Sequence, residues 1–267
     1  MQLLEHSVTF IGNATLLLRF GDLCLLTDPN FIHKGEEVSI GYGLHATRQT
    51  NPACQIADLP PIDVLVLSHF HGDHFDQVAE RELDKSTLIV TPPDAAHELA
   101  TRGFTNVHPL KTWQRFEQTK NASHLRLTAT PGKHGPTLVD FALPNVMGSV
   151  LELEDSRAGL QLSVYISGDT LVFDDLLDIP RRHPAIDLAF LHLGGTRVMG
   201  IMVTMDGKQG VELLGIVRPR HAIPIHYDDY DLFSSALSDF QTEVRAAGLE
   251  DRVTYLCRGD TYDLRRA

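Results

Sequence analysis

The chain has 267 residues, 43% of them hydrophobic and 22% charged, which is ordinary for a globular protein able to bury a sizeable core. Its formal net charge of −12 at pH 7 argues against nucleic acid as the main partner, because proteins that bind it usually carry a basic face. No apolar run approaches the length of a membrane helix, and the first residues lack the pattern of a signal peptide, so we expect no membrane partner.

The cysteines indicate the redox environment of the protein, and the absence of linker-like stretches indicates its domain organisation. Cys24, Cys54 and Cys257 are scattered, odd in number and without zinc-ligand spacing; Cys24 and Cys257 lie in apolar runs typical of a core. We therefore expect a reduced, cytoplasmic setting. No repeat or low-complexity tract divides the chain, which predicts a single domain over residues 1–267.

The first third of the chain is rich in strand signals. Apolar runs around Gly-Asn and Gly-Asp turns predict strands and a hairpin over residues 8–11, 14–20 and 23–29. A long loop follows, over residues 30–61, and loops of this length inside a compact domain are usually functional. We expect its histidines, His33 and His45, to lie on the loop surface rather than at a substrate site.

Residues 69–74 read His-Phe-His-Gly-Asp-His, directly after a buried apolar run. Neutral imidazole is the commonest protein ligand of zinc, and a carboxylate is a good companion. On extended backbone His69 and His71 point to the same side and could bind one ion. The glycine permits a tight turn that redirects Asp73 and His74 towards a neighbouring point. The cluster predicts ligands for two adjacent metals; the alternative is a run of solvated loop histidines.

Helix and strand signals alternate after this cluster. Helices are predicted over residues 75–83, 94–101 with Asp94 as the cap, 206–217 and 232–247, the last being the longest. Strands are predicted over residues 87–90, 125–130, 149–152, 160–166, 187–192, 221–226 and 253–257. Strands followed by mixed strand and helix, twice over, indicate two packed sheets with helices outside.

Two metals need more ligands than residues 69–74 provide. Three further side chains follow predicted strands beside Gly or Pro: His134, Asp169 and His226. Strand ends are where side chains from different strands can converge, so these are the candidates to complete the site.

Four segments together carry a family resemblance. His-Phe-His-Gly-Asp-His at 69–74, Pro-Gly-Lys-His-Gly at 131–135, Ser-Gly-Asp-Thr at 167–170 and Pro-Ile-His-Tyr at 224–227 resemble, in order and spacing, the metallo-β-lactamase-fold hydrolases. The likeness covers nearly the whole chain. It is nearest to the branch with the ascorbate-phosphate lactonase-like and N-acylphosphatidylethanolamine phospholipase D-like proteins.

The resemblance implies an α/β fold: a four-layer αβ/βα sandwich of two mixed β-sheets with external helices. It also implies two divalent metal ions, for which zinc suits the ligand types and Mn or Fe stays open. One ion would take His69, His71 and His134. The other would take Asp73, His74 and His226. Asp169 would bridge the ions, and a hydroxide between them would be the nucleophile.

Some positions depart from the family pattern or leave their role open. Asn13 stands where relatives often carry His, and we expect it to affect the strand start and not the metals. His192 stands where many relatives carry Pro. Together with Asp73 it is the candidate catalytic residue, as a proton donor or substrate contact; the alternative is a hydrogen-bonded structural histidine. Asp28 could orient a ligand imidazole or cap a strand end.

The predicted function is a binuclear metal-dependent hydrolase acting on a small-molecule phosphodiester or lactone. A phosphodiester would need cationic groups near the metals, and Lys133 and Arg197 are the visible candidates. A phospholipid in a membrane is disfavoured, because no basic amphipathic helix is evident. The alternatives are a nuclease of the same fold and a non-catalytic, metal-dependent ligand-binding or sensing protein. A homo-oligomer is left open.

Overall fold

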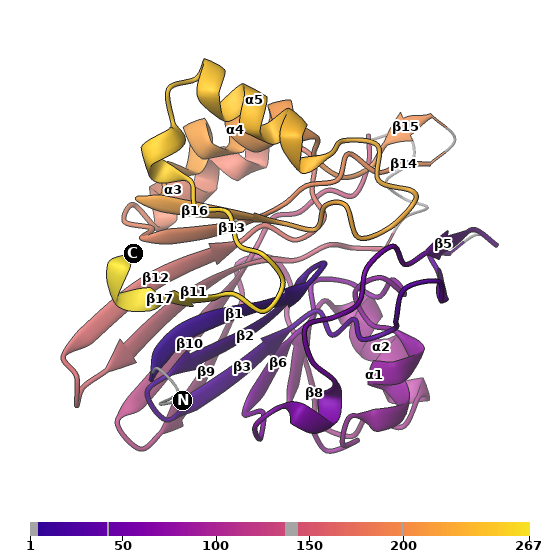
Figure 1. Ribbon diagram of the computed structural model, residues 1–267. Coiled ribbons are helices and arrows are strands. Elements are labelled where there is room, and N and C mark those ends of the chain that lie inside the picture. The colour runs from indigo at the N-terminus through magenta and orange to yellow at the C-terminus, as the bar shows by residue number, and fades with distance from the viewer. Residues whose placement is uncertain (1–4, 42, 137–143, 199) are drawn as a thin grey trace.

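The computed structural model describes residues 5–41, 43–136, 144–198 and 200–267, and two large mixed sheets form its centre (Figure 1). The first sheet has the strand order β17-β1-β2-β3-β6-β7-β8. Its strands are β1 (His6–Gly12), β2 (Thr15–Phe20), β3 (Leu23–Thr27), β6 (Val64–Val66), β7 (Ile89–Thr91), β8 (Val107–Pro109) and β17 (Thr261–Asp263). Strands β3, β6, β7 and β8 pair in parallel, whereas β17, β1, β2 and β3 pair antiparallel.

The second sheet has the order β16-β13-β12-β11-β10-β9. Its strands are β9 (Arg115–Lys120), β10 (Ser123–Thr130), β11 (Gly148–Asp155), β12 (Leu160–Ile166), β13 (Leu188–His192) and β16 (His221–Ile225). Strands β12, β13 and β16 run in parallel, so their carboxyl ends meet at one edge of the sheet. Two short hairpins extend from the sheets: β4 (Glu37–Ser39) with β5 (His45–Thr47), and β14 (Arg197–Val198) with β15 (Ile201–Met202).

Helices cover the outer face of each sheet (Figure 1). The α-helices are α1 (Gln77–Glu82), α2 (Pro93–Thr101), α3 (Asp178–Arg182), α4 (Gly207–Val217) and α5 (Leu237–Ala246). The 3₁₀ turns are η1 (Ile56–Asp58), η3 (Asp174–Leu177), η4 (Glu250–Arg252) and η5 (Leu264–Arg266). Helices α1 and α2 pack on the first sheet, and α3, α4 and α5 pack on the second.

Alternation along the strands explains the layers. On β12, Val164 and Ile166 enter the core between the two sheets, whereas Tyr165 enters the core under the helices. On β3, Leu25 and Leu26 divide in the same way between the central core and the core under α1 and α2. Successive strand residues point to opposite faces, so a continuous apolar run serves two cores. The predicted αβ/βα sandwich is confirmed.

Several element predictions need correction. Helix α2 is capped at Pro92, and Asp94 lies in its first turn. Helix α5 begins at Leu237, five residues later than predicted, and at 10 residues it is shorter than α4 with 11. The backbone before α5 forms hydrogen bonds outside the helix, since the amides of Ser234 and Ser235 both donate to the carbonyl of Gly194.

The end of the chain also differs from the sequence prediction. Residues 253–257 are not a strand; they make one isolated bridge, Ala222 with Val253, and the last strand is β17. Cys257 is exposed, so its predicted core position is wrong, whereas Cys24 is buried as expected. Within the described residues no helix is long and apolar enough to span a membrane. The single domain over residues 1–267 stays a prediction.

Candidate metal centre

The side chains predicted as ligands converge at one edge of the sandwich. The turn after β6 supplies His69, His71, Asp73 and His74, and three segments of the second sheet supply His134 after β10, Asp169 after β12 and His226 after β16. Their ligand atoms form two groups, each with all atoms within 4.8 Å of one another. The first group is His69, His71 and His134. The second is Asp73, His74, Asp169 and His226. The rings of His69 and His74 are 4.1 Å apart between centroids, so the groups are adjacent.

The first group consists of three neutral imidazoles that crowd together. His69 Nε2 lies 3.0 Å from His71 Nδ1, and the His134 ring lies within about 5 Å of both, at 5.0 and 5.1 Å between centroids. Burial, and then the neighbouring imidazoles, lower the pKa of His69 well below its usual range and that of His71 to about 3. Metal ligation requires unprotonated nitrogen, so this environment suits an ion.

Backbone carbonyls orient two of the imidazoles. His134 Nδ1 donates to the carbonyl of Val203 at 3.0 Å, and His226 Nδ1 donates to the carbonyl of Leu193 at 3.0 Å. A carbonyl only accepts, so each ring carries its proton on Nδ1 and turns Nε2 towards the site. Metal-binding histidines commonly have such a partner on the far nitrogen.

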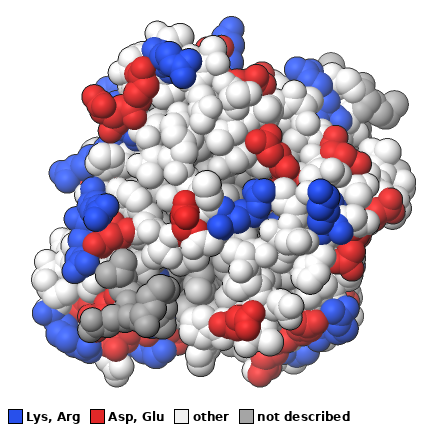
Figure 2. All heavy atoms as spheres, viewed as in Figure 1, with Lys and Arg blue, Asp and Glu red and all other residues white. Residues whose placement is uncertain are grey.

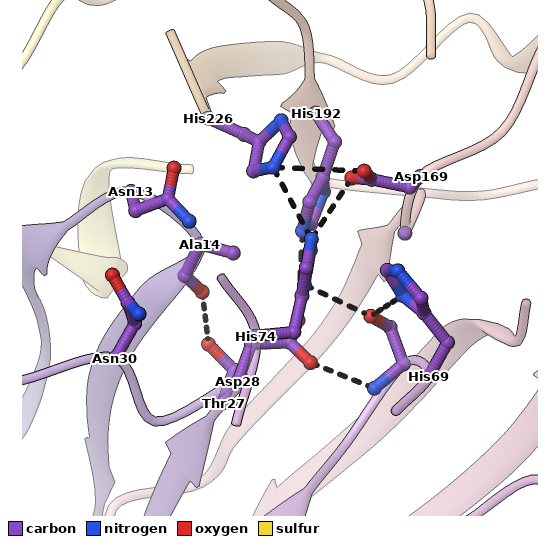
Figure 3. Close-up of polar contacts among 12 residues, drawn as sticks. Asn13, Ala14, Thr27, Asp28, Asn30, His69, His74, Asp169, His192 and His226 are labelled. Carbon is purple, nitrogen blue, oxygen red and sulfur yellow. Dashed lines mark hydrogen bonds and ion pairs between the residues drawn. The ribbon is translucent and has the colours of Figure 1, made fainter. Parts of the chain in front are cut away.

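The second group combines two carboxylates with two imidazoles. His74 Nε2 lies 3.3 Å from Asp169 Oδ1, and His226 Nε2 lies 3.6 Å from Asp169 Oδ2 (Figure 3). His226 Nε2 also lies 3.4 Å from Asp73 Oδ2. Burial raises the pKa of Asp73, but His74 and His226 outweigh it and bring that pKa to about 2. The same imidazoles hold the pKa of Asp169 well below its usual range against the effect of burial.

A metal ion fits this second group. Asp73 and Asp169 are 5% and 2% exposed; within the described structure Asp73 Oδ1 has no hydrogen-bond partner, and Asp169 Oδ1 has only the ion-pair contact with His74 Nε2 at 3.3 Å. Buried charges need a paired charge or a metal, and buried acceptors need a partner. A cation between these oxygens and the Nε2 atoms would meet both requirements.

Asp28 and His192 lie beside His74, and the ligand atoms of the three form a further close group. Asp28 Oδ1 accepts from the amide of Ser68 at 2.7 Å, and its Oδ2 lies 3.6 Å from His74 Nδ1 and 3.5 Å from His192 Nε2 (Figure 3). Of the two roles considered for Asp28, the geometry favours orienting a ligand imidazole.

His192 stacks on His74 with a ring-centroid distance of 5.9 Å and is fully buried. Its Nδ1 lies 3.3 Å from Ser167 Oγ. It does not line the cavity at the site. The geometry therefore favours the hydrogen-bonded structural alternative, and a catalytic role for His192 stays a prediction.

Asn13 is a contact of the site that sequence reasoning missed. The side chain of Asn13 donates through Nδ2 to the backbone carbonyl of Asp73 at 2.7 Å. The backbone carbonyl of Asn13 accepts from the backbone amide of His226 at 2.9 Å. The backbone amide of Asn13 donates to Asp229 Oδ2 at 3.0 Å. Contrary to expectation, Asn13 therefore contacts two candidate ligands as well as the strand end. The Gly-Asn pair signalled the turn, in which Asn13 has φ 52, but not these partners.

A cavity opens on both groups. It is lined by His71, Asp73, His134 and Asp169, and by six further residues: Ile40, Leu44, Thr196, Val198, Val203 and Leu232. The two predicted cations are not part of this lining. Arg197 is exposed and donates to the carbonyl of Gly200, and Lys133 Nζ lies 5.8 Å from the ring centroid of Phe173. His33 and His45 are exposed, as expected.

Comparison with known proteins gives consistent matches. Residues 25–227 match the family model of the beta-lactamase superfamily domain. A UPF0173 metal-dependent hydrolase of Pyrococcus furiosus is 25% identical over 257 residues, covering 96% of this chain and 99% of that protein. One from Carboxydothermus hydrogenoformans is 27% identical over 255 residues, covering 92% and 95%.

Solved structures share the fold. A possible metal-dependent hydrolase from Veillonella parvula superimposes with a TM-score of 0.80 at 22% identity, covering 97% of this chain and 100% of that chain. An isothiocyanate hydrolase from Delia radicum gut bacteria gives a TM-score of 0.78 at 21% identity, covering 97% and 99%.

Proposed function

The chain belongs to the beta-lactamase superfamily, and we propose that it is a hydrolase that depends on two divalent metal ions. The observation that carries this proposal is the pair of adjacent buried groups, one of three histidines and one of two aspartates and two histidines. Relatives named as metal-dependent hydrolases, which align over nearly their whole length, support it. The histidine and aspartate ligands suit zinc, with Mn or Fe as alternatives.

Two bound divalent ions would lower the pKa of a water molecule and stabilise negative charge on the attacked group. The chain's own part is to hold the ligands in place. Backbone carbonyls fix the rings of His134 and His226, and Asp28 faces the far nitrogen of His74. Asp73 lines the cavity, and the carboxylate oxygen that is not used to bind the ion could accept a proton from the attacking water. The same cavity is where a small-molecule substrate, a phosphodiester or a lactone, would bind.

Two alternatives have less support. A nuclease usually carries a basic face, whereas this chain has a net charge of −12. On the face that Figure 2 shows, Lys and Arg are interspersed with Asp and Glu and form no broad basic field. A non-catalytic metal-dependent ligand-binding protein would not need two adjacent groups of ligands opening on one cavity.

Metal analysis of the purified full chain, combined with hydrolysis assays, tests the proposal. We expect about two ions per chain and hydrolysis of a lactone or a phosphodiester. The variant His71→Ala should lose metal and activity, because it removes a ligand of the first group. His33 is an exposed loop histidine, so His33→Ala gives a matched control. This variant should keep both metal and activity. Protein that stays metal-free after loading, or that holds two ions but hydrolyses neither class of compound, would refute the proposal.

A further inference from the structure

The long loop over residues 30–61 places an arginine in the interior of the protein. Arg48 directly follows β5, forms an isolated antiparallel bridge with Tyr230, and is 0% exposed. Its Nε donates to the carbonyl of Thr50 at 3.2 Å, and its guanidinium carbon lies 5.2 Å from the ring centroid of Tyr230. An arginine is almost never fully buried unless its charge is paired.

Asp229 is the paired charge, and it is buried to the same degree. Its Oδ1 lies 3.6 Å from Arg48 Nη2 and 3.5 Å from Arg258 Nη1, and also accepts from the hydroxyl of Thr50. Its Oδ2 accepts from the backbone amide of Asn13 at 3.0 Å. One buried carboxylate therefore joins the long loop, the segment before β17 and the turn after β1.

The turn after β1 packs directly against both arginines. A Cβ added to Gly12 would lie 3.0 Å from Arg48 Nη2 and 3.2 Å from Arg258 Cδ, so no free space separates the turn from the two side chains. Within the described structure neither Nη of Arg48 forms a hydrogen bond, so the ion pair with Asp229 compensates its charge. The position of this turn therefore depends on Arg48.

The candidate ligand His226 has a backbone conformation that needs such support. His226 and Asp228 have φ 60 and φ 57, in the left-handed region that is costly for a residue with a Cβ. The backbone amide of His226 donates to the backbone carbonyl of Asn13 at 2.9 Å, and the backbone carbonyl of Asp229 accepts from the amide of Gln49 at 2.8 Å. Costly conformations persist when their surroundings hold them, and these contacts hold both sides of the segment.

We propose that Arg48 is a positioning residue, which acts through Asp229 and holds His226 in place for the second group of candidate ligands. This inference rests on the metal centre of the proposed function. It gives the long loop two separate tasks. Ile40 and Leu44 line the cavity, whereas Arg48 is not part of the lining and supports a ligand.

The first test uses the metal-free full chain and amide hydrogen exchange. Arg48→Met keeps an unbranched side chain but breaks the buried ion pair. We expect exchange at the amides of Asn13 and His226, relative to the amides of β12, to become at least about tenfold faster. Asp155→Asn is the matched control, because it changes another buried contact, with His6 at 2.9 Å. This control should leave the relative exchange of the two amides unchanged.

The second test measures the affinity of each Zn²⁺ ion by competition with a graded chelator series. Arg48→Met should weaken one ion about 10- to 100-fold and leave the other unchanged, whereas Asp155→Asn should bind both as the unchanged protein does. Arg48→Lys keeps the charge and should show a smaller effect of the same kind. Because Arg48 acts through Asp229, the double variant with Asp229→Asn should lose no more affinity than the worse single variant.

The outcomes separate this inference from the proposed function. If exchange at His226 rises in Arg48→Met but the unchanged protein binds no Zn²⁺ or hydrolyses nothing, the hydrolase proposal fails and the positioning of His226 stands. If relative exchange stays the same, if both ions weaken equally, or if the two single effects add in the double variant, the inference is overturned and the hydrolase stands. Should Arg48→Met not fold, unchanged exchange in both Arg48→Lys and Asp229→Asn overturns the inference equally.

Discussion

Replacing Asn13 should weaken metal binding by the second group and leave the three-histidine group nearly unchanged. Asn13 connects two members of the second group. Its side chain donates to the backbone carbonyl of Asp73 at 2.7 Å, and its backbone carbonyl accepts from the backbone amide of His226 at 2.9 Å. Two substitutions separate its contributions. Asn13→Gly removes the side chain but tolerates the left-handed backbone at φ 52, and Asn13→Ala removes the side chain and also strains that backbone.

The magnitudes follow from these contacts. Loss of the donor to a buried carbonyl costs about 1–3 kcal/mol. Asn13 Oδ1 is itself buried without a partner, so its removal offsets part of that cost. We expect the free energy of unfolding of Asn13→Gly to fall by about 1 kcal/mol. Asn13→Ala should lose about 1 kcal/mol more, the cost of a left-handed conformation for a residue with a Cβ. Loss of a group that supports a metal ligand typically lowers metal affinity about 10- to 100-fold.

Two measurements check this prediction. Urea unfolding of the metal-free protein gives the stability difference, and competition with a graded chelator series gives the affinity of each bound ion. The expected result is one weakened ion and one unchanged ion, with Ala less stable than Gly. Equal weakening of both ions, or an Ala variant as stable as Gly, would refute the reasoning.

Three further predictions concern packing, pH and metal removal. A Cβ at Gly72 would lie 2.5 Å from the carbonyl oxygen of Ser39, so Gly72→Ala should lower both metal content and melting temperature; unchanged values of both would show that the turn repacks freely. His6 Nε2 lies 2.9 Å from Asp155 Oδ2 and joins β1 to β11. Burial raises the pKa of Asp155, but His6 and the backbone amides of Ala158 and Arg157 together outweigh burial, so that the pKa is lowered. Asp155 therefore contributes stability above its unfolded pKa of about 3.9 that is lost as pH falls through the lower folded pKa. Urea unfolding gives the difference in free energy of unfolding between the unchanged protein and Asp155→Asn. This difference should narrow below about pH 4, and a difference that does not vary with pH would contradict the assignment. Finally, a chelator should lower the melting temperature of metal-loaded protein, since ions bind the native state; an unchanged temperature would count against a bound metal.

Local spacing was enough to predict much of the site, because much of it is local. His69 and His71 alternate on extended backbone, and the turn that follows redirects Asp73 and His74. His134 and His226 could be found because a ligand type directly after an apolar strand is an uncommon pattern. The resemblance to one family then supplied the grouping. The structure places the candidate side chains in two adjacent clusters, with Asp169 in the second, and its bridging role stays a prediction. That these side chains bind metal stays a prediction.

The sequence predictions that were wrong have a common physical cause. The pattern of apolar residues indicates which side chains are buried, but it does not indicate which backbone or side-chain groups form hydrogen bonds. Leu256 is buried in the core between the sheets, and Val253 makes a single bridge to Ala222, so this run has the burial of a strand without its ladder. Asn13 shows the same limit from the polar side. Its partner Asp73 is distant in sequence, and no local pattern specifies that contact.

The two sheets supply opposite halves of the site, and this arrangement links folding to metal binding. One turn of the first sheet provides four candidate ligands, and the second sheet provides the other three, so the groups exist only when the sheets are packed. Bound ions would therefore tie the sheets together, which is why their removal should destabilise the fold. Two carboxylates would only partly neutralise two divalent ions, so the centre would remain electrophilic. Since the described walls of the cavity add no cation, the metals alone would provide positive charge. Such a centre would polarise the group under attack and stabilise the negative charge that develops on it.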